Sequence, residues 1–532
     1  MSNSHHPYHP IVYVRGFAML QSEIEETVAD PYMGFNIGAT KARTLWTGKV
    51  KKFFFESPLV RLMREKPNAY DDVYVNGDDA LIANNADYKV PYQCVVIFRY
   101  YDEASEDFGT GNTPPIEHFA KGLSELILQL RKKICANPDN AMKAEDFRVY
   151  LVAHSMGGLV CRAFLQNPAL GDAEARKCVD KFFTYATPHN GIDLRIVRNV
   201  PAWVSLGDAN NFNRDKMAQF FSLPAGTEDV SEVKNFPPDR IFNLVGTNPA
   251  DYAVARGLSS WAVGEASDGL VRITNATTFG RNAAGEKVPS PSAFAYRSHS
   301  GQYGIVNSEE GYQNLTRFLF GALRVDGFLD VDQVTFPTEI QSLCDSGKSV
   351  CASYQFEIAV SVRGHQWQMH RRTVRENSAI FRQFDELFPK TNGVRAPDRK
   401  QSPHLFSVFL DPKKSVRKDS SGEGSVSFAL DLNVQVPDYE VDGALFLKQH
   451  YEGGYIYRDL IIIEAFPDST APAGWLVKYG YQDKTPNVAD NTAEIYDLAD
   501  GSGIGFDLEV VQSNRPGITA KLRFEARNWN RW

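Results

Sequence analysis

One serine in this chain has the surroundings that a nucleophile requires. Ser155 follows the apolar run 149–152 and comes just before a run of helix-like residues. The residues two positions before and after it, Ala153 and Gly157, are small, and Gly158 follows. This is the G-x-S-x-G pattern of a sharp strand-to-helix turn, with Ala153 in place of the first glycine. A hydroxyl is a weak nucleophile without a base beside it, so Ser155 predicts acyl-transfer chemistry only together with a histidine and an acid.

Three histidines follow predicted strands and are candidates for the base. His154 adjoins Ser155 and projects away from it at a tight turn, so we exclude it as the base and keep it as a pocket residue. His189 ends another strand and is a second pocket candidate. His299 follows the last predicted strand and comes after every acidic candidate. Because serine, acid, histidine is the chain order that accompanies this type of turn, we predict His299 as the general base.

Two aspartates are candidates for the acid that orients the histidine. Asp268 lies in the turn Ser-Asp-Gly-Leu-Val, whereas Asp251 follows the predicted strand 241–246. The chemistry requires only a carboxylate that accepts a hydrogen bond from the far nitrogen of the imidazole. We favour Asp268 and keep Asp251 as the alternative acid.

A glycine turn near the N-terminus is a candidate for oxyanion stabilisation. The apolar strand 11–14 runs into Arg15 and Gly16. Backbone N–H groups just beyond such a turn can face the nucleophile and stabilise the negative charge that develops on a carbonyl oxygen. Arg15 and Gly16 are therefore pocket candidates.

Strand-like and helix-like segments alternate in the first part of the chain. The predicted strands are 11–14, 93–98, 149–153, 181–186, 241–246 and 293–296, and the predicted helices are 115–136, 156–167 and 309–323. This alternation predicts an α/β domain over residues 1–326, with a mostly parallel sheet and helices on both faces. Two polar segments with aromatic clusters, about 20–90 and 195–235, are predicted insertions that either cap the site or pack on the domain.

The chain changes character after residue 326. Runs with a period of two, separated by turn-rich stretches, predict an antiparallel β-sandwich domain over 327–532. The role of this domain stays open.

Composition narrows the other possibilities. A chain of 532 residues is too long for one ordinary core, and a net charge of −8 argues against nucleic acid as a partner. No apolar run is long enough to span a membrane, and the N-terminus lacks a secretion-signal pattern, so we expect a cytoplasmic protein. Export by another route, contact with a membrane surface and the oligomeric state stay open. The six cysteines show no C-x-x-C spacing, and we expect free thiols, including Cys344 and Cys351, and neither a metal nor a cofactor.

Five motifs in the first domain together resemble the α/β-hydrolase lipases and esterases, in the branch of bacterial triacylglycerol lipases and GPI-inositol-deacylase-like proteins. In chain order they are His9-Pro-Ile-Val-Tyr-Val-Arg-Gly-Phe17, Val152-Ala-His-Ser-Met-Gly-Gly158, Ala186-Thr-Pro-His-Asn-Gly191, Ser267-Asp-Gly-Leu-Val271 and His299. The resemblance implies Ser155 as nucleophile, Asp268 as acid and His299 as base. It also implies an oxyanion hole made by the backbone N–H groups of Phe17 and Met156. Two positions depart from the family: Arg15 replaces a common histidine, and Ala153 replaces a glycine.

The expected activity is therefore that of a serine carboxylic-ester hydrolase that works through an acyl-enzyme. The residues do not identify the natural ester or its acyl-chain length, and they do not decide whether the substrate is a lipid. Two alternatives use the same residues: a phospholipase-type toxin effector that targets membranes, and an acyltransferase that passes the acyl group to an acceptor other than water.

Overall fold

The computed structural model describes residues 7–16, 21–65, 69–71, 73–76, 89–100, 102–107, 114–192, 212–249, 266–415, 424–442, 448–471, 474–482 and 491–530. The chain divides into two compact units, Met1–Phe320 and Gly321–Arg531. The predicted boundary after residue 326 falls inside the strand β12 (Leu323–Thr335), so the division lies earlier than we predicted. Within the described residues, no helix is both long and apolar enough to cross a membrane.

The first unit is built on a parallel sheet, in which the described residues form seven strands in the order β11-β8-β7-β6-β1-β5-β4. Every described pairing along this order is parallel. The strands are β1 (Ile11–Val14), β4 (Val73–Asn76), β5 (Val95–Phe98), β6 (Val149–His154), β7 (Val179–Tyr185), β8 (Ile241–Gly246) and β11 (Ser292–Ala295). All six strands predicted for this domain are present, so the predicted α/β architecture is confirmed. A parallel sheet places the carboxyl ends of its strands along one edge, which is where Ser155 follows β6.

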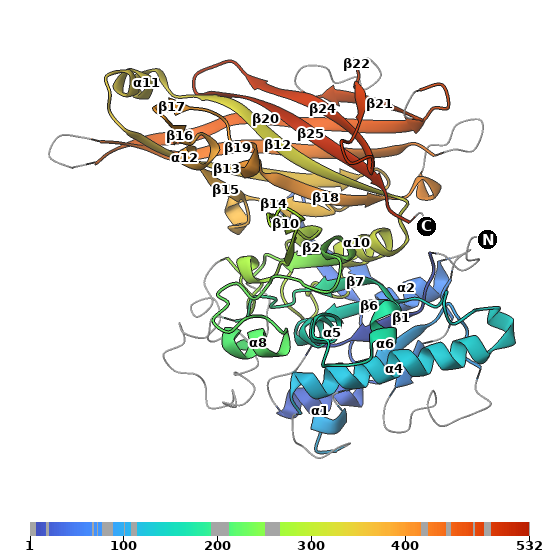
Figure 1. Cartoon of the computed structure of the whole chain (residues 1–532). Helices are drawn as coiled ribbons and strands as arrows, with labels where there is room; N and C mark the ends of the chain where they lie inside the picture. Colours follow the sequence, from blue (N-terminus) through green and yellow to red (C-terminus); the bar gives the residue numbers. More distant parts are fainter. Residues whose placement is uncertain are drawn as a thin grey trace. The chain divides into compact units, whose positions relative to one another are not determined.

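Helices cover both faces of this sheet, with α4, α5 and α6 on one face and α10 on the other (Figure 1). The helices of the unit are α1 (Gln21–Ala29), α2 (Pro58–Arg64), α4 (Ile116–Ala136), α5 (Met156–Gln166), α6 (Ala173–Lys177), α8 (Arg214–Phe220) and α10 (Glu309–Phe320). In α4 the apolar residues recur at helical spacing and are buried, while the polar residues between them face away from the core. Two short strands, β9 (Phe279–Arg281) and β10 (Lys287–Pro289), form a separate hairpin.

We predicted that the segment 20–90 is an insertion, but only part of it is. It contains α1, α2 and a hairpin of β2 (Ala39–Thr44) and β3 (Val50–Phe55), but it also supplies the edge strand β4 of the main sheet. The apolar run 73–75 is only three residues long and has polar residues on both sides, so the sequence did not reveal β4. In the segment 195–235, the described part includes α8 and is packed structure; residues 193–211 lie outside the described residues.

The second unit contains two antiparallel sheets that share one apolar core, as predicted for a β-sandwich. The first sheet has the order β18-β12-β25-β24-β23, and the second β14-β13-β19-β20-β21-β22 with β15 beside β13. Besides β12, the strands are β13 (Val350–Val362), β14 (His370–Arg372), β15 (Ile380–Gln383), β18 (His404–Leu410), β19 (Val426–Asp442), β20 (Lys448–Pro467), β21 (Trp475–Tyr481), β22 (Asn491–Thr492), β23 (Ile495–Asp497), β24 (Gly503–Gln512) and β25 (Gly517–Asn528). The short elements are α11 (Thr338–Asp345), α12 (Phe384–Leu387), β16 (Lys390–Thr391) and β17 (Val394–Arg395). All six cysteines of the chain are free thiols.

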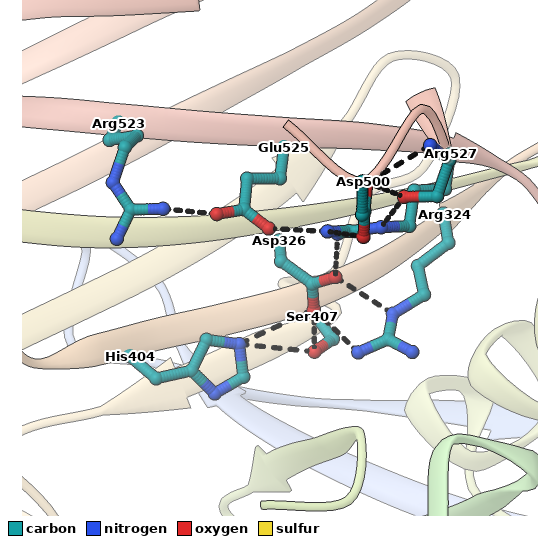
Figure 2. Close-up of polar contacts among 9 residues, drawn as sticks. Arg324, Asp326, His404, Ser407, Asp500, Arg523, Glu525 and Arg527 are labelled. Carbon is teal, nitrogen blue, oxygen red and sulfur yellow. Dashed lines mark hydrogen bonds and ion pairs between the residues drawn. The ribbon is translucent and has the colours of Figure 1, made fainter. Parts of the chain in front are cut away.

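A buried carboxylate ties three strands of the first sheet of this unit together (Figure 2). Asp326 on β12 accepts a hydrogen bond from Ser407 on β18 at 2.5 Å and forms an ion pair with Arg324 at 2.8 Å. His404 Nε2 and Arg527 Nη1 lie 3.4 Å and 3.8 Å from its oxygens. Burial alone raises the pKa of Asp326, but Arg324, His404 and Ser407 outweigh burial and hold the pKa well below its ordinary value.

Replacing Asp326 with asparagine is expected to destabilise the second unit by about 2 to 3 kcal/mol, because Arg324 loses its buried partner while retaining some access to solvent. The native pKa of Asp326 is depressed, so its contribution to stability is present above the ordinary value of 3.8 and is lost as the pH falls through the native value. The difference between the two proteins should therefore shrink in acid.

Hydrogen exchange of β12 and β25 in urea measures this difference within the second unit itself. The control is Asp385→Asn, which breaks an ion pair with Arg395 whose aspartate side chain is 68% exposed and which should cost little. Equal effects of the two substitutions would contradict a structural role for the Asp326 cluster.

Candidate active site

Ser155 occupies the turn between β6 and α5 in a backbone conformation that is unusual for a residue with a side chain. Its φ is 51° and its ψ is −127°. Residues held in such a conformation are strained and persist where the surrounding structure enforces it. The glycines after the turn are part of that structure: a Cβ on Gly157 would lie 2.3 Å from the Val14 carbonyl oxygen, and one on Gly158 would lie 2.1 Å from Thr187 Oγ1. The turn therefore requires both glycines.

The structure brings Ser155, His299 and Asp268 together. His299 Nε2 lies 3.0 Å from Ser155 Oγ, and His299 Nδ1 lies 2.9 Å from Asp268 Oδ2. All three residues are buried. The spacing of the two imidazole nitrogens allows one of them to accept a proton from the serine while the other donates a hydrogen bond to the carboxylate.

The carboxylate of Asp268 is held in place by its own turn. Its Oδ1 accepts hydrogen bonds from the N–H groups of Leu270 at 3.0 Å and Val271 at 2.8 Å, which leaves Oδ2 for His299. The N–H of His299 also donates to the Asp268 carbonyl at 2.9 Å. Asp268 and His299 are therefore held together by a backbone contact as well as by the contact between their side chains. The alternative acid, Asp251, lies outside the described residues.

The predicted oxyanion turn lies directly against the serine. A Cβ on Gly16 would be 2.4 Å from Ser155 Cβ and 2.7 Å from the His154 carbonyl oxygen. Phe17, one of the two predicted oxyanion donors, lies outside the described residues. The other, Met156, is the first residue of α5, and the first N–H groups of a helix point beyond its N-terminus without an acceptor in the helix.

Replacing Gly16 with alanine is expected to lower kcat/KM for an ester by at least about a hundredfold, because the new methyl group must displace Ser155 or the backbone of His154. The measurement is the hydrolysis rate of a soluble ester. The control is Gly454→Ala, since a Cβ at Gly454 meets nothing within 4 Å and its φ is not in the left-handed region. Retention of full activity in Gly16→Ala would contradict the close approach of this turn to Ser155.

The remaining predicted pocket residues lie around the three central side chains. His154 does not contact Ser155 Oγ as a base; its Nε2 lies 3.0 Å from the His299 carbonyl oxygen. Burial, together with the neighbouring His299 and Arg15, lowers the pKa of His154 well below its ordinary value. Arg15 donates from Nη1 to the Met33 carbonyl at 2.7 Å, so it supports the segment after α1.

His189 belongs to a neighbouring buried network. Its Nε2 lies 3.3 Å from Thr184 Oγ1, and its carbonyl accepts a hydrogen bond from Arg162 at 2.9 Å. Burial and the charge of Arg162 lower its pKa well below the ordinary value. These two contacts join His189 to Thr184 on β7 and to Arg162 on α5, not to Ser155.

Sequence reasoning missed a buried ion pair behind the histidine. Arg297 donates to Glu310 at 2.9 Å and 3.1 Å and to the Thr40 carbonyl at 2.7 Å, and both charged side chains are 2% exposed. This pair joins the strand end that carries His299 to α10 and to β2. The sequence does not distinguish a buried arginine from an exposed one. The one feature that could have indicated a role for Arg297 is its position two residues before His299.

One group of described residues offers three metal-type ligands close together. Asp438, Glu440 and His450, in the second unit, place their ligand atoms within 4.8 Å of one another. The two carboxylates are half-buried and the histidine is exposed, and exposed acidic groups of this kind are common without an ion. We assign no metal to them.

The architecture is that of an α/β-hydrolase fold. It is defined by the parallel sheet, by the strained serine at the carboxyl end of the central strand, and by the histidine and aspartate beside that serine.

No family model matches the chain, and no curated protein matches it. Among solved structures, the chain is similar to phospholipase PlaB from Legionella pneumophila, with a TM-score of 0.27, 11% identity and coverage of 79% of this chain and 85% of that one. The same protein in complex with thio-NAD gives a TM-score of 0.25 at 11% identity, covering 83% and 89%. The Tle4–Tli4 complex gives 0.11 at 15% identity, covering 37% and 35%. Likenesses this weak assign no activity to this chain.

Proposed function

We propose that this protein is a serine carboxylic-ester hydrolase that acts on acyl esters through a covalent acyl-enzyme. The observation that carries the proposal is the continuous hydrogen-bonded path from Ser155 Oγ to His299 at 3.0 Å and from His299 to Asp268 at 2.9 Å. Burial of three polar side chains costs free energy of folding, so stability does not explain this arrangement. Nucleophilic catalysis does, because it requires a serine, a base and an acid in contact.

In the first half of the reaction, Ser155 Oγ attacks the ester carbonyl carbon while His299 Nε2 takes the hydroxyl proton. Asp268 accepts a hydrogen bond from Nδ1 and stabilises the resulting imidazolium. The N–H groups of Met156 and Phe17 are the proposed donors to the oxyanion. When the tetrahedral intermediate collapses, the ester C–O bond breaks, and the proton moves from His299 to the departing alcohol.

In the second half, water attacks the acyl-enzyme carbonyl. His299 takes a proton from the water, a second tetrahedral intermediate forms, and its collapse releases the carboxylic acid as the proton returns to Ser155. The net reaction consumes one ester and one water and yields one acid and one alcohol, without a cofactor.

A lipid ester is the substrate class that we favour. The exposed large apolar side chains of the first unit, among its described residues, are concentrated in the segment 37–63. Those in this segment are Ile37, Leu45, Trp46, Val50, Phe54, Val60 and Met63; the other two of the unit are Val288 and Tyr296. An apolar surface concentrated in one segment is typical of a site that contacts lipid or another apolar partner.

The test is a chain-length series of p-nitrophenyl esters assayed beside phospholipids, with and without detergent, with free fatty acid as the phospholipid readout. Hydrolysis of at least one ester by the purified protein, with a burst of acylation, is the expected result. Product analysis with competing alcohols distinguishes hydrolysis from transfer, since an acyltransferase forms a new ester instead of the free acid. Absence of hydrolysis across the whole series would overturn the proposal.

A further inference from the structure

We propose that the β2–β3 hairpin docks the first unit on an anionic lipid surface. This inference rests on the proposed function, because a lipid ester hydrolase must reach its substrate at such a surface. The binding itself is independent of catalysis and can be measured without it.

The hairpin carries an unusual concentration of positive charge for a chain with a net charge of −8. Between residues 38 and 55 there is no Asp or Glu, and five residues are basic: Lys41, Arg43, Lys49, Lys51 and Lys52. Lys41, at the base, forms an ion pair with Glu310. Among the described residues, the other four have no acidic partner, and all four are exposed. The hairpin therefore presents uncompensated positive charge to solvent.

The register of the hairpin concentrates this charge further. Arg43 lies directly opposite Lys51, and Lys52 is opposite Ala42. Like charges at directly opposed positions of an antiparallel pair are destabilising. An anionic partner that neutralises both Arg43 and Lys51 would remove the repulsion between them and stabilise the hairpin. The pair therefore indicates a ligand of negative charge.

Apolar side chains at the same hairpin indicate that the partner is a lipid surface. Trp46, at the turn, is 97% exposed, and Phe54 and Val50 on β3 are 74% and 65% exposed. Every residue from 42 to 52 is exposed, so neither face of this half of the hairpin is covered by the described parts of the first unit. Tryptophan with flanking basic residues is the combination that favours the interface between water and lipid.

The base of the hairpin is fastened to the segment that carries the catalytic histidine. The N–H of Thr40 donates to the Gln302 carbonyl at 2.9 Å, and the Thr40 carbonyl accepts from Arg297 at 2.7 Å. Gln302 Nε2 lies 3.2 Å from Thr40 Oγ1. His299 lies between Arg297 and Gln302 in the chain. Trp46 is six residues beyond Thr40, or about 20 Å at roughly 3.3 Å per residue, so a surface that binds the tip lies within a short distance of the site.

The experiment measures binding of the full chain carrying Ser155→Ala to vesicles, so that the lipid is not hydrolysed. Vesicles of phosphatidylcholine with phosphatidylglycerol are compared with vesicles of phosphatidylcholine alone. We expect binding to the anionic vesicles that weakens as salt is added. Arg43→Glu with Lys51→Glu should weaken this binding by about thirtyfold or more, and Trp46→Ser by about tenfold. Thermal unfolding checks that each variant is folded.

The matched control is Lys121→Glu with Lys132→Glu, which makes the same change in charge at two exposed positions of α4. Equal loss of binding in this control and in the hairpin double variant would overturn the proposal, as would unaltered binding by the hairpin variants. Hairpin-dependent self-association in the absence of vesicle binding would assign the hairpin to a second copy of the chain instead. Hydrolysis of a soluble ester by the unaltered protein tests the proposed function separately, so the two proposals can fail independently.

Discussion

Replacing Ser155 with alanine is expected to lower kcat for ester hydrolysis by about a millionfold, the loss that follows removal of a serine nucleophile in enzymes with this arrangement. The substitution removes the oxygen that lies 3.0 Å from His299 Nε2 and that is the attacking atom in the proposed mechanism. Substrate binding and folding should be nearly unchanged, because alanine retains the Cβ on which Gly16 packs. The readouts are steady-state hydrolysis and covalent labelling by a fluorophosphonate, and both should be lost.

The control for this substitution is Ser342→Ala, in α11, where the hydroxyl is exposed and donates only to the Thr338 carbonyl one turn earlier in the same helix. Its activity should equal that of the unaltered protein. Burst-phase acylation that persists in Ser155→Ala would show that another residue is the nucleophile.

Replacing Asp268 with asparagine is expected to lower kcat by about ten-thousandfold while leaving the local geometry intact. The amide oxygen can still accept from the N–H groups of Leu270 and Val271, so the turn keeps its shape. The amide nitrogen would then face His299 Nδ1 and favour the tautomer in which Nε2 carries a proton. In that tautomer Nε2 cannot accept the proton of Ser155.

The companion variant is Asp251→Asn, which tests the alternative acid directly. If Asp268 orients His299, Asp251→Asn retains the activity of the unaltered protein and Asp268→Asn does not. The reverse outcome would assign the role to Asp251. Steady-state kinetics on one soluble ester, with the unfolding midpoint of each variant measured in parallel, separates a catalytic loss from a folding defect.

The fold class could be predicted from the sequence because its signals are local. Apolar runs of four or five residues, such as those in β1, β5 and β6, alternate with a helical period such as that in α4. A buried parallel strand leaves this trace in its own residues. The strand β4 left a weaker trace, because its apolar run Val73-Tyr-Val75 is only three residues long and polar residues flank it on both sides. The strand also occupies an edge of the sheet. Its place depends on pairing with β5, which the local sequence does not encode.

The candidate site divides in the same way. The positions of Ser155 and of the glycines around it follow from the sequence, because the turn requires small residues at fixed offsets and no other residue types fit. The sequence favoured Asp268 over Asp251 but left both open, because the position of an acid distant in the chain depends on where its loop ends in space. The tertiary structure places Asp268 at 2.9 Å from His299 and adds two backbone donors to its other oxygen.

The sequence by itself determined the type of sheet, the turn that holds Ser155 and the short set of residues that can act with it. Those features depend on contacts between residues close in the chain. Only the tertiary structure decided which aspartate meets His299, that Arg297 and Glu310 form a buried pair behind it, and that the basic, aromatic β2–β3 hairpin is fastened to the same segment. Each of these joins residues far apart in the chain, and their pairing depends on the packing of the whole unit.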